Sequence, residues 1–140
     1  GFVTLLTDTI EIKKIRDKKT KKNIKNHMNT DEHKIGKNKL LPAIKIGRFA
    51  IKEKYSKKGL GTEFFGSIMY NLNELSKEKV GFRFVVIEGY ARAYPLYVKK
   101  FNFINLKKDD DIISKNIKEI IKKDPERTFY LYYDLSNASN

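Results

Sequence analysis

The segment from Ile44 to Thr62 constrains the fold of this chain more than any other part of its sequence. An extended, β-prone run breaks there into a short basic turn, which opens through Gly59 and Gly61 into a helix. Strand, turn and helix in this order direct several backbone N–H groups, and the positive end of a helix dipole, at one point. An anion with several oxygens, such as a pyrophosphate, suits that point, and Lys57 and Lys58 add positive charge beside it.

Two glycines spaced one apart do not by themselves establish an anion site. Gly59 and Gly61 would also be chosen where a strand-to-helix turn needs a positive φ, so both interpretations stay open from the residues alone. Two other nucleotide motifs are missing from the sequence: the Gly-x-x-x-x-Gly-Lys-Ser/Thr P-loop, and Gly-x-Gly-x-x-Gly with an acidic residue about twenty positions later.

The hydrophobic pattern predicts alternating strands and helices. A helix over 60–79 has apolar residues at three- and four-residue spacings, and the apolar run 82–87 is typical of a strand covered on both faces. With the strand over 43–51 they predict a right-handed crossover between parallel strands, and so an α/β fold with a mixed sheet. The other expected elements are strands over 2–7, 9–15 (pairing back on the first), 103–106 and 127–135, and helices around 91–100 and over 109–122.

Length and composition predict one domain over residues 1–140, with no disulfide and no membrane span. The chain has no cysteine, and no apolar run approaches the roughly 18 to 20 residues that cross a bilayer. We therefore expect a cytoplasmic protein. The two histidines, His27 and His33, lie in a polar stretch, and no metal site is predicted. Residues 16–40 are rich in lysine and predict a basic loop with a helical turn, with a partner-binding arm as the alternative.

The net charge of +13 has two explanations that the sequence does not separate. A basic surface is the electrostatic footprint of a nucleic-acid partner, because Lys and Arg displace counterions from phosphates. A coding bias toward AT-rich codons would produce the same excess of Lys, Asn and Ile without such a partner.

Residues 56–61 resemble the acetyl-CoA-binding motif of the Gcn5-related N-acetyltransferase (GNAT) superfamily, Arg/Gln-x-x-Gly-x-Gly/Ala after a strand, with Ser56 at the position where Arg or Gln is usual. The resemblance implies acetyl-CoA as the cofactor, with its pantetheine arm against the strand before the motif and its pyrophosphate on the amides of residues 57–62. The candidate cofactor-binding residues are Phe49, Ala50, Ile51, Ser56, Lys57, Lys58, Gly59, Leu60, Gly61 and Thr62.

The same resemblance implies a GNAT acyl-CoA N-acyltransferase fold that is shortened at its N-terminus. Members normally begin with a strand and one or two helices that form one wall of the acceptor site, and the chain begins after that point in the pattern. We therefore expect either a fragment of a longer protein or a shortened member that borrows this wall from a partner chain. The helix expected over 109–122 is an insertion between the family's last two strands.

Residues 93–103 are similar to the family pattern Ala-x-x-Phe-Tyr-x-Lys-x-Gly-Phe, which implies that Tyr97 is the acid that protonates the departing thiolate. The stretch is one residue longer than usual, which leaves Tyr94 as the alternative acid. The same pattern implies that Lys99 binds the cofactor. Glu88, at the carboxyl end of its strand where open sheets place ligands, is the candidate base, or else caps the next turn.

The resemblance implies a CoA-dependent N-acetyltransferase in which a primary amine attacks acetyl-CoA directly. Residues 47–51 and 128–135 look like bacterial acetyltransferase toxins of toxin–antitoxin pairs, which acetylate aminoacyl-tRNA. The acceptor stays open between tRNA, a small-molecule amine and a protein amine, and the partner between a second copy and an antitoxin-like protein. The alternative function is a truncated, non-catalytic module that binds CoA or nucleic acid.

Overall fold

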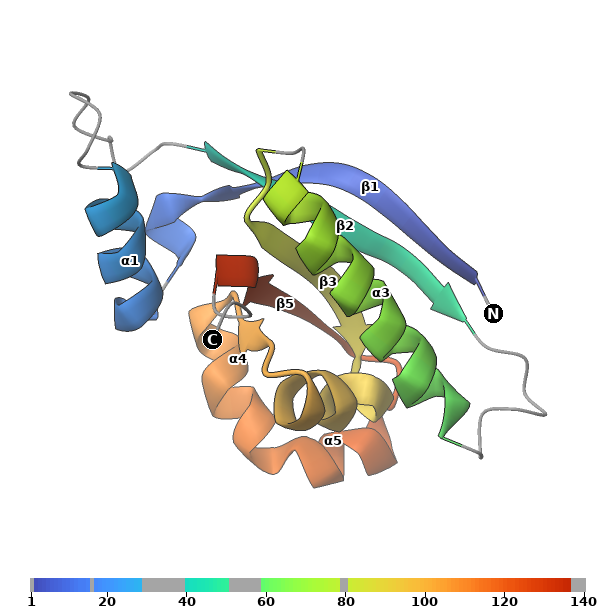
Figure 1. Ribbon diagram of the computed structural model, residues 1–140. Coiled ribbons are helices and arrows are strands. Elements are labelled where there is room, and N and C mark those ends of the chain that lie inside the picture. The colour runs from blue at the N-terminus through green and yellow to red at the C-terminus, as the bar shows by residue number, and fades with distance from the viewer. Residues whose placement is uncertain (1, 16, 29–39, 51–58, 79–80, 137–140) are drawn as a thin grey trace.

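A computed structural model describes residues 2–15, 17–28, 40–50, 59–78 and 81–136 (Figure 1). Within these ranges, five strands form one mixed sheet in the order β1-β2-β3-β5-β4. Strands β2 and β3 are parallel, and the other neighbouring pairs are antiparallel. The strands are β1 (Phe2–Glu11), β2 (Leu40–Ala50), β3 (Phe84–Tyr90), β4 (Ile104–Asn105) and β5 (Thr128–Asp134).

Helices cover both faces of the sheet. On one face lie α3 (Leu60–Glu78), a helical segment made of a 3-10 turn (Ala91–Ala93) and a π turn (Leu96–Lys100), and α5 (Ile117–Lys123). On the other face, α1 (Lys18–Met28) buries Ile24 in a second core cluster with residues of β1, β2, β3 and β5. The short helix α4 (Lys108–Ile113) precedes α5. No helix within the described ranges is both long and apolar enough to cross a bilayer.

The predicted crossover between parallel strands is confirmed. Residues 43–46 of β2 pair in parallel with residues 84–87 of β3, and α3 connects the two strands along the chain. The apolar spacing in α3 buries Phe65, Ile68 and Leu72 against the sheet. The run 84–87 is buried on both faces of the sheet, as its continuous apolar character indicated.

Residues 9–15 do not form a separate strand that pairs back on the first. Residues 9–11 continue β1, which pairs along its whole length with β2, and Ile12–Lys14 form a 3-10 turn. No glycine, proline or asparagine interrupts residues 2–11. The chain therefore stays extended for ten residues, and the partner strand comes from far along the sequence.

The basic loop expected over 16–40 contains more helix than the single turn predicted for it, because residues 18–28 form α1. Asp17 begins this helix: its carboxylate accepts hydrogen bonds from the amide and the hydroxyl of Thr20, each at 2.7 Å. Thr20 and Ile24 are buried one turn apart, whereas Lys18, Lys19 and Lys22 lie on the outer side of the helix. So short an apolar stripe gives little periodicity to detect. Residues 29–39 lie outside the described ranges.

The helix expected over 109–122 does lie between the last two strands, but it is broken. Helices α4 and α5 are separated by a 3-10 turn (Ser114–Asn116). The Ser114 hydroxyl donates to the Asp111 carbonyl at 3.2 Å and accepts from the Asn105 amide at 3.3 Å, which favours the tighter turn. Four isoleucines of α4 and α5 pack against the core on the same face of the sheet as α3. They are Ile113, Ile117, Ile120 and Ile121.

Candidate active site

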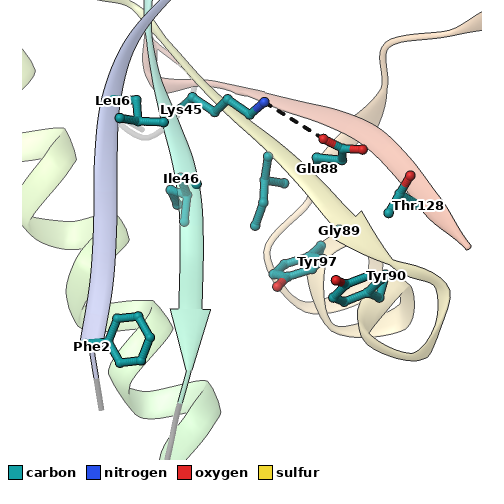
Figure 2. A pocket seen from close by; sticks show the side chains of 11 residues that line it. Phe2, Leu6, Lys45, Ile46, Glu88, Gly89, Tyr90, Tyr97 and Thr128 are labelled. Carbon is teal, nitrogen blue, oxygen red and sulfur yellow. Dashed lines mark ion pairs between the residues drawn. The ribbon is translucent and has the colours of Figure 1, made fainter. Parts of the chain in front are cut away.

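The parallel pair β2–β3 opens at its carboxyl end. Its ladder ends at Ile46 and Ile87, after which β2 continues along β1 and β3 continues along β5. At the other end of β3, the Arg83 guanidinium donates two hydrogen bonds of 2.8 Å to the buried Asp134 carboxylate of β5. An ion pair therefore joins β3 to β5 at one end of β3, and β2 separates from β3 at the other end. A hollow of about 590 Å³ lies where β2 and β3 separate (Figure 2).

A bulge at Gly47 helps to direct β2 away from β3. Leu5 pairs with Ile46 and Thr4 pairs with Arg48, so Gly47 is an extra residue opposite β1. The described ladder of β3 has no partner for Gly47, which lines the hollow. Backbone groups of β2 therefore face the hollow rather than a neighbouring strand. A glycine inside a strand pattern is the sequence signal for such a bulge, and the strand predicted over 43–51 did not include one.

Tyr97 lies on the wall of this hollow (Figure 2). Its side chain is only 6% exposed, and its ring packs against Phe65 at 5.2 Å between centroids. The ring also lies directly on the backbone of Gly89, where an added Cβ would be 2.7 Å from Cε2 of Tyr97. Burial raises the pKa of the Tyr97 phenol, so that it holds its proton throughout the neutral range. It is therefore a proton donor at neutral pH.

Tyr94, the alternative acid, has another role in the structure. Its hydroxyl donates to Oδ1 of Asn105 at 3.2 Å, and its ring packs on Phe129 at 4.8 Å. It is not among the residues that line the hollow. The geometry therefore favours Tyr97 as the acid.

Glu88 lines the same hollow but projects from the opposite face of the sheet, because consecutive side chains of a strand alternate and Gly89 is the residue that faces Tyr97. The Glu88 carboxylate lies 3.9 Å from Nζ of Lys45. The charge of Glu88, followed by burial and a hydrogen bond to Glu88, raises the pKa of Tyr130 on β5. Glu88 thus has two neighbours that orient it, and it reaches the hollow from the side away from α3.

The predicted cofactor loop is described only in part. Ile51, Ser56, Lys57 and Lys58 lie outside the described ranges. The backbone of Phe49 and Ala50 belongs to β2 beyond the point where β3 departs, as the pantetheine prediction requires.

The start of α3 keeps features of an anion site. Gly59 has φ +72°, a conformation that glycine adopts without strain, whereas Gly61 has no positive φ and is helical. The Gly59 carbonyl accepts from the amides of Thr62 and Glu63 at 3.1 and 3.3 Å. The backbone amides that could bind an anion are therefore those that precede Thr62. Anion binding at this turn stays a prediction.

The hollow brings together two of the predicted site residues, Tyr97 and Glu88. Lys99 is exposed and does not line it. Other lining residues were not predicted, because their approach depends on how β1 and β5 pair with β2 and β3. They are Phe2, Leu6, Lys45, Ile46, Gly47, Ile87, Gly89, Tyr90 and Thr128.

The mixed sheet and the helices of the described residues match solved structures that have the GNAT fold. Among them are structures of two acetyltransferase toxins, AtaT and KacT. No family model matches the sequence, and no curated protein matches it either.

The likeness to these toxins extends over nearly all of this chain. AtaT complexed with acetyl-methionyl-tRNAfMet superposes with a TM-score of 0.63 and 17% identity, covering 97% of this chain and 62% of that one. A tyrosine-to-phenylalanine variant of KacT superposes with a TM-score of 0.62 and 18% identity, covering 96% of this chain and 62% of the KacT chain. AtaT bound to acetyl-CoA and the C-terminus of the antitoxin AtaR superposes with a TM-score of 0.54 and 17% identity, covering 96% of this chain and 58% of the AtaT chain. The chain therefore spans about three fifths of the length of these neighbours.

Proposed function

We propose that this chain is a CoA-dependent N-acetyltransferase that acetylates a primary amine in the hollow between β2 and β3. The observation that carries the proposal is the position of Tyr97, a buried and protonated phenol on the wall of a hollow that lies where a parallel pair separates. The Gly59 turn and the first amides of α3 fit the diphosphate of CoA. A neighbour with the same fold has been solved with acetyl-CoA, which is compatible with this fit.

Acetyl-CoA, when bound, supplies a thioester carbonyl for the attack of the amine and a thiol as the leaving group. Backbone N–H groups of β2 beside the bulge polarise that carbonyl, because the β3 ladder does not use them. Glu88 attracts the acceptor as an ammonium ion and takes up its proton, directly or through water. As the C–N bond forms and the C–S bond breaks, Tyr97 gives its proton to the sulfur and then recovers one from solvent.

The acceptor that fits best is an amine on a nucleic acid, such as an aminoacyl-tRNA. A second hollow of about 670 Å³ shares Lys45 with the first. Its lining contains more lysines than acidic residues, and Nζ of Lys107 lies 4.2 Å from the centroid of the Tyr130 ring. Phosphates held there would position an acceptor that reaches the first hollow. The charged residues that line the second hollow are Lys13, Lys14, Lys45, Lys107, Lys108, Asp8 and Asp109.

Acetyl-CoA binding followed by thiol release tests the proposal. We expect saturable binding by calorimetry, and release of free CoA that requires an amine acceptor, measured with a thiol reagent. Binding without release for any amine or charged tRNA would instead support the non-catalytic CoA module. Absence of CoA binding, together with RNA affinity that falls steeply with salt, would leave only a nucleic-acid-binding module.

Reversing charge in the second hollow should weaken tRNA binding. For Lys107→Glu with Lys108→Glu, we expect the plot of log affinity against log salt to become shallower by about 0.7 to 0.9 for each phosphate that the variant no longer neutralises. The matched control is Lys122→Glu with Lys123→Glu on α5, which makes the same charge change outside this hollow. Filter binding of a charged tRNA over a salt series measures both. Equal effects of the two pairs would show that only net charge matters.

A further inference from the structure

Exposed apolar side chains gather around the hollow that contains Tyr97. Phe2 is 55% exposed, Leu6 50% and Tyr90 46%, and all three line this one hollow. Phe2 and Leu6 come from the edge strand β1 on one side of the gap, and Tyr90 is the last residue of β3 on the other side (Figure 2). Large apolar residues kept in solvent around one cavity mark a surface that is covered when a ligand binds.

The same hollow also holds groups that suit the polar part of an acceptor. Glu88 presents a carboxylate, which complements an ammonium ion, and Thr128 adds a hydroxyl on the neighbouring strand β5. Paired residues of neighbouring strands share a face of the sheet, and so do alternate residues of one strand. Leu6 pairs with Lys45 and Lys45 with Val86, so Phe2 and Leu6 extend from the same face as Glu88, Tyr90 and Thr128. The Glu88 carboxylate and the exposed apolar side chains therefore lie on the same face of the sheet around this hollow.

We propose that the acceptor carries a bulky apolar side chain on the carbon next to its reactive amine, and that Phe2, Leu6 and Tyr90 form the surface on which this side chain rests. This inference rests on the proposed function and narrows its substrate class to amines of the leucyl, isoleucyl, methionyl or phenylalanyl type. An α-amine of this class would place its ammonium near Glu88 and its side chain on β1. A glycyl or acidic acceptor would leave the apolar surface in water or bring a second carboxylate toward Glu88.

Amino acid amides give a direct test, because they keep the α-amine and the side chain and dispense with the RNA. With the whole chain and acetyl-CoA, we expect kcat/KM for leucinamide and phenylalaninamide to exceed that for glycinamide by about tenfold or more, since each methylene in an apolar site discriminates by about 10-fold or more. Phe2→Ala and Leu6→Ala should each reduce this ratio several-fold. Because both residues are half exposed, neither substitution opens a cavity in the core.

Leu5→Ala is the matched control. Leu5 lies on the same strand, is 44% exposed, faces the other side of the sheet and does not line the hollow. We expect it to leave the ratio unchanged. A ratio near one in the wild-type chain, or a drop in Leu5→Ala equal to that in Phe2→Ala, would overturn the inference.

Equilibrium binding separates this inference from the proposed function. Ligand-observed NMR with CoA in place of acetyl-CoA measures the affinity of the amides without any reaction. Tighter binding of leucinamide than of glycinamide, abolished in Phe2→Ala and Leu6→Ala, supports the acceptor surface even if no amide is acetylated. Turnover with no side-chain preference in rate or in binding overturns the surface and leaves the acetyltransferase proposal standing.

Discussion

Replacing Tyr97 by Phe is expected to lower kcat by about 100- to 10,000-fold, the range that a positioned general acid contributes. The ring stays in place, because its packing against Phe65 and Phe103 and on Gly89 involves only ring atoms. The substitution removes the hydroxyl that we propose as the donor of a proton to the departing sulfur. Burial raises the pKa of this phenol in the parent chain above its ordinary value, so the hydroxyl that is lost carries its proton at neutral pH. KM for acetyl-CoA should change little.

Tyr94→Phe provides the comparison. This substitution removes a hydroxyl of the same kind from the same helical segment, but one that donates to Asn105 rather than facing the hollow. We expect a loss of about 1 kcal/mol in the free energy of unfolding, with kcat preserved. Steady-state kinetics and denaturant unfolding of both variants measure the contrast. If Tyr94→Phe abolished activity and Tyr97→Phe kept it, the assignment of the acid would be reversed.

The crossover unit was predictable because its signals are local. The spacing of Phe65, Ile68 and Leu72 in α3 and the unbroken apolar run of β3 are each contained in a single element. The same locality placed Glu88 at the carboxyl end of β3, next to the hollow. The full length of helix α1 was not predicted, because few of its residues are buried, chiefly Thr20 and Ile24, and they lie among many lysines.

The β1 side of the hollow was not predictable from local pattern, since it is assembled by pairing between distant strands. Phe2 and Leu6 reach the hollow only because β1 pairs with β2 in one register, with the bulge at Gly47. Likewise, the choice between Tyr94 and Tyr97 depended on a π turn over Leu96–Lys100 that shifts the helical register. The motif residues 56–58 stay a prediction.

Gly89→Ala is expected to displace the ring of Tyr97, the proposed acid, while leaving its hydroxyl group in the molecule. A Cβ at this position would lie 2.7 Å from Cε2 and 2.9 Å from Cδ2 of Tyr97, distances that real Cβ atoms essentially never show. The ring cannot yield freely, because it is 6% exposed and its centroid lies 5.2 Å from that of Phe65. Overpacking of this kind costs about 1 to 3 kcal/mol of folding free energy. A displacement of about 1 Å lowers kcat by up to about 100-fold.

Two measurements decide whether Gly89 acts through Tyr97. Gly81→Ala is the control, since a Cβ there has no atom of the described residues within 4 Å beyond its chain neighbours, and Gly81 has no positive φ. It should keep both the stability and the kcat of the parent chain. In a Tyr97→Phe background, Gly89→Ala should still destabilise the fold, because the ring remains, yet it should lower kcat no further, because the proton donor is already gone. A further fall in kcat in that background would mean that Gly89 supports the hollow by another route. A fully active and stable Gly89→Ala would mean that the ring does not rest on this strand.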